Sequence, residues 1–96
     1  MADNSRMGNV SQVETYGKNL KKVEGQVREV FKKLQQSTRS VGNVWDDDQF
    51  KQFEATFNTE IVRSIDKICV QMDIMANYVQ KMVEHHRRAQ QERINL

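Results

Sequence analysis

Two long apolar stripes of helical spacing, separated by one short break, constrain this 96-residue chain more than any other feature. In residues 13–41 and again in residues 50–82, large apolar residues recur at steps of three and four. This spacing is a heptad pattern, which places the apolar residues along one side of an α-helix. Proline, the strongest helix breaker, is absent from the chain. The sequence therefore predicts two long helices.

The first helix is expected over residues 11–40, after a flexible N-terminal tail at residues 1–10. Ser11 and Glu14 have the spacing of a capping box, which predicts a helix start at Ser11. Gly17 lies beside the stripe, where the lack of a side chain would let a neighbouring helix approach closely, whereas Gly25 on the outer face has no evident role. The apolar stripe consists of Val13, Tyr16, Leu20, Val23, Val27, Val30 and Leu34.

The break at residues 41–45 is predicted to be the turn of a hairpin. Gly42 and Asn43 both tolerate left-handed backbone angles, which commonly end a helix. Asp46 and Gln49 resemble a second capping box, and the neighbouring acids would oppose the dipole of the next helix favourably.

The second helix is expected over residues 46–91, before a flexible tail at residues 92–96. Consecutive four-residue steps from Phe57 to Ile61 and Ile65 interrupt its heptad. Beyond the reach of the first helix, its basic C-terminal end overhangs the hairpin. The main apolar stripe after the aromatic residues consists of Ile61, Ile65, Ile68, Met72, Met75 and Val79.

These elements predict an all-α fold, an antiparallel two-helix hairpin. Two helices alone enclose too little core for a surface of this size. We therefore expect the hairpin to dimerise into a four-helix bundle, with a second copy or a related helical protein, through the two apolar stripes as its interface. The residues leave open whether the dimer is homomeric or heteromeric.

The turn carries a motif that resembles a known family. Trp45 is followed by Phe53 eight residues later and by Phe57 after four more, with Asp46, Asp47 and Phe50 between them. This pattern on paired helices is similar to that of the WxG family, the small helical hairpins of bacterial type VII secretion, although Asp47 stands where the family has Gly. The family's secretion signal has an acid four residues after a tyrosine, and here that residue after Tyr78 is Met82.

The resemblance implies a non-enzymatic protein, either a small secreted substrate or a helical partner of a larger effector or secretion component. The alternative is a cytosolic structural or adaptor subunit that assembles a larger complex through the same hairpin. The missing acid after Tyr78 and the C-terminal overhang favour this alternative.

No residue set predicts catalysis, a cofactor or a metal. Cys69 has no base nearby in the sequence, and His85 and His86 are adjacent, whereas ligands on one helix face are spaced three or four apart. Residues 46–48 are acidic but lack the alternating acids and the glycine of a calcium loop. The charged groups therefore indicate helix capping and solvated faces.

Net charge and hydropathy bear on partners and location. A net charge of +2, with the C-terminal arginines diluted by acids, makes nucleic acid an unlikely partner. No apolar run reaches the roughly 20 residues of a membrane span, and residues 1–10 do not resemble a signal peptide. We expect a cytoplasmic protein without membrane insertion, and export without a cleaved signal stays open.

Overall fold

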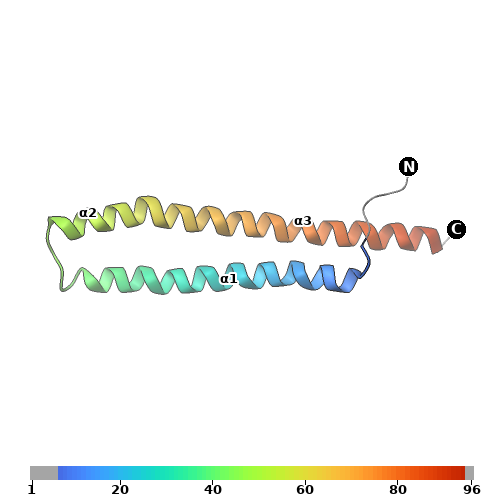
Figure 1. Ribbon diagram of the computed structural model, residues 1–96, viewed down its shortest axis with the longest axis horizontal. Coiled ribbons are helices and arrows are strands. Elements are labelled where there is room, and N and C mark those ends of the chain that lie inside the picture. The colour runs from blue at the N-terminus through green and yellow to red at the C-terminus, as the bar shows by residue number, and fades with distance from the viewer. Residues whose placement is uncertain (1–6, 95–96) are drawn as a thin grey trace.

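The computed structural model describes residues 7–94 and has the shape of a long helical hairpin (Figure 1). Helix α1 (Val10–Val41) forms one arm. The other arm is a continuous helical rod made of α2 (Asp48–Thr56), the π-helical segment η1 (Phe57–Val62) and α3 (Arg63–Ile94). The molecule measures 72 × 23 × 16 Å, and its radius of gyration is 21.2 Å. A compact domain of this length would have a radius of about 12 Å, so the hairpin is highly extended.

Both arms begin with a side-chain cap, although not at the residues expected from the sequence. The Asn9 side chain accepts the Gln12 N–H at 3.1 Å, so α1 starts at Val10 and Ser11 is not its cap. The Asp47 carboxylate accepts the Phe50 N–H at 2.9 Å, so this residue, and not Asp46, caps α2. In both cases an extended residue supplies an oxygen to a backbone N–H that the first helical turn leaves without a partner.

The turn between the arms uses ordinary right-handed backbone, contrary to the left-handed conformation expected at Gly42 and Asn43. Gly42 has φ −60° and ψ −20°, and no residue within 7–94 has a positive φ. A Cβ at position 42 would crowd the turn, because it would lie 3.1 Å from the Arg39 carbonyl oxygen and 3.1 Å from the Phe50 ring. The Trp45 N–H donates to the Val41 carbonyl at 2.8 Å and closes the turn.

The interruption of the heptad in the second arm coincides with η1. In a π-helix the backbone bonds run from residue i to i+5, so each turn holds more residues than an α-helical turn. This wider turn takes up the consecutive four-residue steps that begin at Phe57, the first residue of η1. The apolar stripe can therefore continue along the same arm despite the irregular spacing.

The two arms pack through a narrow seam of mostly small residues. The seam consists of Gly17, Glu24, Phe31, Cys69, Ala76 and Val83, which recur every seven residues on each arm. Cys69, Ala76 and Val83 are 0–3% exposed. Every seam residue directly follows a large apolar residue of the sequence pattern, as Gly17 follows Tyr16 and Ala76 follows Met75. One residue corresponds to about 100° of rotation, so the larger residues lie beside the seam rather than in it.

The C-terminal end of α3 continues beyond the start of α1, as expected from the sequence (Figure 1). A Cβ placed on Gly17 would contact Val79, so the N-terminal part of α1 lies beside α3 near Val79. Helix α3 then continues past this point to Ile94, three residues further than predicted, which makes residues 92–94 helical. Residues 1–6 and 95–96, parts of the predicted tails, lie outside the described residues.

The seam predicts opposite effects for alanine at the two glycines of α1. A Cβ at position 17 would lie 2.9 Å from Val79 Cγ1, whereas a Cβ at position 25 would have no atom within 4 Å. We expect Gly25→Ala to stabilise the hairpin by about 1 kcal/mol, the helix-propensity difference between the residues. Gly17→Ala gains the same propensity but overpacks the seam, for a net loss of about 1 kcal/mol. Urea unfolding of the two variants measures both, and equal effects would contradict the close approach at Gly17.

The Asp47 cap predicts a pH-dependent contribution to stability. Its bond to the Phe50 N–H lowers the pKa of Asp47, so the cap stabilises the fold above the ordinary aspartate pKa and is lost as the pH falls through the lowered value. At pH 7 we expect Asp47→Ala to lower Tm by about 3–6 °C. This difference from wild type should shrink below about pH 4. Asp46→Ala is the matched control. A larger loss of Tm in that variant would show that Asp46, and not Asp47, caps α2.

Candidate functional site

The residues predicted as a dimer interface form one open apolar face of the hairpin. We give the name open face to Val13, Tyr16, Leu20, Val23, Val27, Val30, Leu34, Ile61, Ile65, Ile68, Met72, Met75 and Val79. None of them is buried, and Val30 and Tyr16 are 66% and 58% exposed. The others on this face are also exposed or partly exposed. The hairpin thus leaves its most regular apolar surface in contact with solvent.

Both arms contribute to this face. Tyr16 and Leu20 of α1 line one groove together with Ile68, Met72 and Met75 of α3. Lys67 and Gln71 stand at the edge of the same groove. The stripes of the two helices therefore lie on the same side of the seam, as a facing pair of helices would require.

At the hairpin end, the predicted turn motif divides into buried and exposed residues. Phe50 and Phe57 are buried, whereas Trp45 is 38% and Phe53 51% exposed. The aromatic rings form a connected cluster. The ring centroids of Trp45 and Phe50 are 5.3 Å apart, and those of Phe53 and Phe57 are 6.2 Å apart. Phe57 stacks on Phe31 of α1, with a centroid distance of 5.8 Å. This cluster ties the turn to both arms. Its exposed rings bring further apolar surface to the end of the molecule.

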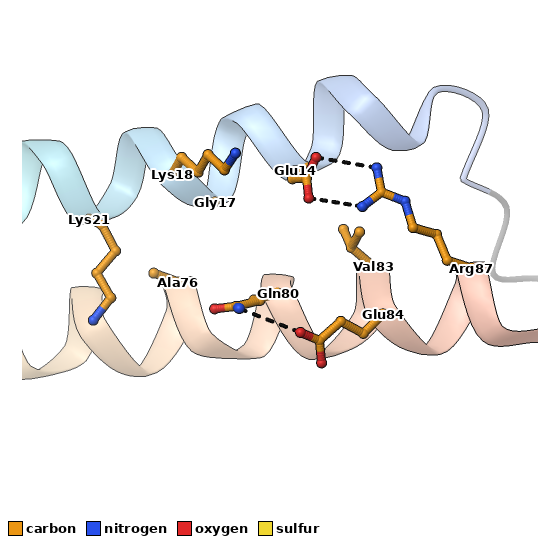
Figure 2. Close-up of a pocket in the computed structure, with 9 residues that line it drawn as sticks. All are labelled: Glu14, Gly17, Lys18, Lys21, Ala76, Gln80, Val83, Glu84 and Arg87. Atoms are coloured by element: carbon orange, nitrogen blue, oxygen red, sulfur yellow. Dashed lines mark hydrogen bonds and ion pairs between the residues drawn. The ribbon is translucent and has the colours of Figure 1, made fainter.

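The opposite side of the seam carries a ladder of ion pairs between the arms. Arg87 makes two bonds to the Glu14 carboxylate, at 2.9 and 3.2 Å, and Lys21 contacts Asp73 at 3.0 Å. Arg28 reaches Asp66 at 3.5 Å. Figure 2 shows the Glu14 end of this ladder, above a groove whose lining includes Gly17, Ala76 and Val83. The α1 members are spaced by seven residues, so this side is as regular as the open face but is charged.

Within the ladder, Glu14 and Arg87 shift each other's pKa in the direction expected for an ion pair. The hydrogen bonds from Arg87 lower the pKa of Glu14, and the same bonds raise the pKa of Arg87. The pKa of Arg28 is raised, chiefly by its hydrogen bond to Glu24, a residue buried in the seam. Because the ladder is open to solvent, it adds little stability but fixes which charges face each other.

The chemically reactive side chains do not converge. Cys69 is a free thiol buried in the seam. His85 is exposed and His86 half-buried on α3. Within residues 7–94, no three His, Cys, Asp or Glu side chains are grouped closely enough to hold a metal ion. Among the charged groups of the described residues, three ion pairs join the two arms: Glu14–Arg87, Lys21–Asp73 and Arg28–Asp66.

Two features of this surface were not recognised from the sequence. The ladder could have been found from the heptad spacing of Glu14, Lys21 and Arg28 against oppositely charged residues on the other arm. The second feature is an outer ridge of α3, defined here as Val70, Ile74 and Tyr78, which are 44%, 52% and 59% exposed. Its steps of four residues were hidden among the more numerous apolar residues of the stripe.

Comparison of the chain with protein-family models, curated proteins and solved structures gave no significant match. Among residues 7–94, no helix combines the length and apolar character that crossing a membrane requires.

Proposed function

We propose that this protein is a non-enzymatic helical binding partner, similar to the WxG hairpins, that acts in bacterial secretion as a small substrate or as the companion of a larger effector. The observation that carries the proposal is the open face, thirteen apolar residues from both arms on one side of a hairpin whose other side is charged. A second helical hairpin, from another copy or a related protein, covers this face and completes a four-helix bundle.

The area of the molecule supports a partner of this size. Its accessible surface is 7981 Å². A compact protein of the same mass exposes about 5,700 Å². The excess of about 2,300 Å² exceeds the roughly 800 Å² that each partner contributes to a standard interface. Burial of the open face by a second hairpin would bring the ratio of surface to core into the ordinary range.

The first prediction from this proposal concerns the mass of the purified chain in solution. Light scattering after gel filtration should give twice the chain mass of 11.3 kDa, with a cooperative thermal melt. An unstable monomer or an aggregate would point to a different helical protein as the partner. A stable, folded monomer would contradict the four-helix bundle.

Charge on the open face should weaken this dimer. We expect the double variant Ile68→Glu/Met75→Glu to raise the dissociation constant by at least about tenfold, because both changes place carboxylates in the apolar interface. Lys22→Glu, on the exposed outer side of α1, is the matched control and should leave the constant unchanged. Equal effects of the two changes would show that the dimer forms elsewhere.

Export separates secretion from the alternative role. In its native host, the tagged chain should appear in the medium together with its partner. Disruption of a membrane ATPase that powers the host's secretion system should abolish the export of both proteins. The alternative is a cytosolic adaptor that assembles a larger complex, and it is favoured by Met82, which occupies the position of the family's acidic secretion residue. Retention of the chain in cells alongside an intact complex would support the adaptor.

A further inference from the structure

Each arm of the hairpin has a flank, defined here as the residues that directly precede an open-face residue. Seam residues directly follow open-face residues such as Tyr16 and Met75. One position corresponds to about 100° of rotation, so the flank lies on the other side of the open face from the seam. The groove of the open face extends to Lys67 and Gln71, two flank residues of α3. A partner on the open face would therefore meet both flanks.

Most flank residues are uncharged, and the charged ones have no partner of opposite sign within the hairpin. The neutral members are Gln12, Thr15, Asn19, Gln26, Ser64, Gln71, Ile74 and Tyr78. The charged members are all exposed and consist of Lys22, Glu29 and Lys33 on α1, Glu60 in η1 and Lys67 on α3. None of these charged groups forms an ion pair with another of residues 7–94. Their charge is thus available to a neighbouring molecule.

Glu29 on α1 and Lys67 on α3 lie at the same level along the rod. Their immediate neighbours in the chain, Arg28 and Asp66, contact each other across the arms at 3.5 Å. Within one chain Glu29 and Lys67 do not pair, because the two flanks lie on opposite sides of the seam. An acid and a base therefore stand level with each other on the two outer sides of the hairpin.

Lys33 and Glu60 are a second set of opposite charges at one level, nearer the turn. Counted from Arg28 and Asp66, they lie five and six residues closer to the turn, which places them within about one helical turn of each other. Towards the turn, α1 thus presents an acid and then a base, whereas the other arm presents a base and then an acid. The two flanks are electrostatic complements of each other.

Two copies can close face to face about a two-fold axis in two ways, and one of them brings these complements together. Rotation about the long axis of the rod keeps every residue at its level and places α1 of each copy against the second arm of the other. Glu29 then faces Lys67 of the other copy, and Lys33 faces Glu60. Each contact occurs twice, and Lys22 faces neutral residues.

The opposite arrangement, with the turns at the two ends, places like helices together. Two α1 helices that overlap fully would set Lys22 against Glu29. The same overlap sets Lys67 of one copy against Lys67 of the other, because this residue lies close to the level of the middle of α1. It also leaves Lys33 and Glu60 without an opposite charge. Like charges face to face disfavour this arrangement.

We propose that the partner on the open face is a second copy of this chain, bound with both turns at the same end and with Glu29 and Lys33 opposite Lys67 and Glu60 of the other copy. The apolar stripes supply most of the binding, and the flank charges select the copy and its orientation. This inference rests on the proposed function, because it names the partner of the same face. A different hairpin would need the same alternation of signs on both arms.

Pulsed electron paramagnetic resonance measures the orientation directly. Spin labels are attached at Val44→Cys, a position at the turn that is 88% exposed, in a chain that also carries Cys69→Ala. We expect a label-to-label distance below about 35 Å, because neighbouring helices in a bundle lie about 10 Å apart. Turns at opposite ends of a dimer of 72 Å hairpins would separate the labels by more than about 50 Å. Gly25→Cys, near the middle of α1, is the matched control and gives a short distance in either arrangement.

Charge reversal on the flanks gives a second test in a chain that keeps Cys69. Glu29→Lys should raise the dissociation constant of the dimer about fivefold, because it sets two lysines opposite each other twice per dimer. The double variant Glu29→Lys/Lys67→Glu should return the constant to within about twofold of wild type. Lys22→Glu faces no charge in this arrangement and should leave the constant unchanged.

Three results would overturn the inference. These are a long distance at position 44, a failure of Lys67→Glu to offset Glu29→Lys, and a chain that assembles only with a different hairpin. In each case, assembly that is still weakened by Ile68→Glu/Met75→Glu would leave the proposed function intact. The orientation and the identity of the partner would then be wrong, whereas the open face would keep its role.

Discussion

The close approach of the two arms at the seam is the constraint on which the rest of the structure depends. Gly17 allows Val79 to lie where a side chain would otherwise project, and Cys69 and Ala76 keep the opposite helix narrow. Because small residues occupy the line of contact, the larger apolar residues one position earlier cannot share it. They are turned to one side, where Tyr16, Val23, Val30, Ile68 and Met75 form an exposed part of the open face. A seam of Leu and Ile would have hidden the apolar surface inside the hairpin and left less for a partner.

The two sides of the seam consequently differ in chemical character, one charged and the other apolar. On one side, Glu14, Lys21 and Arg28 contact charges of opposite sign on α3. If one arm slid along the other, these oppositely charged side chains would lose contact. Exposed ion pairs of this kind contribute little to the free energy of unfolding. They do make the polar side unsuitable for burial. On the apolar side, binding to another hairpin would remove hydrocarbon from water.

Placing the binding surfaces on a rod rather than in a cavity suits assembly. An extended hairpin exposes a long apolar face, and its length of 72 Å would suit a partner that is equally long. A long exposed apolar face is compatible with both proposed roles, a companion of a larger effector and an adaptor in a cytosolic complex.

By itself, the sequence determined the two helices, the turn between them and the residues that remain open to a partner. Heptad spacing is a local property, so it identified Tyr16, Ile68 and Met75 as members of apolar stripes, and the close-approach role of Gly17 followed from its place beside them. The irregular steps after Phe57 likewise marked the place where η1 forms. Cap positions were off by one or two residues, because neighbouring polar residues such as Asp46 and Asp47 can each cap a helix in isolation.

Only the tertiary structure decided which line of residues joins the two arms. A stripe pattern gives the side of a helix that is apolar but not the rotation of one helix against another. That rotation depends on the closest packing distance, which the small residues at Gly17, Cys69 and Ala76 set, and on the charge pairs that close the other side. It was therefore the meeting of the two arms that separated seam, ladder, open face and outer ridge, since the ladder alone pairs residues that are 38 to 73 positions apart in the chain.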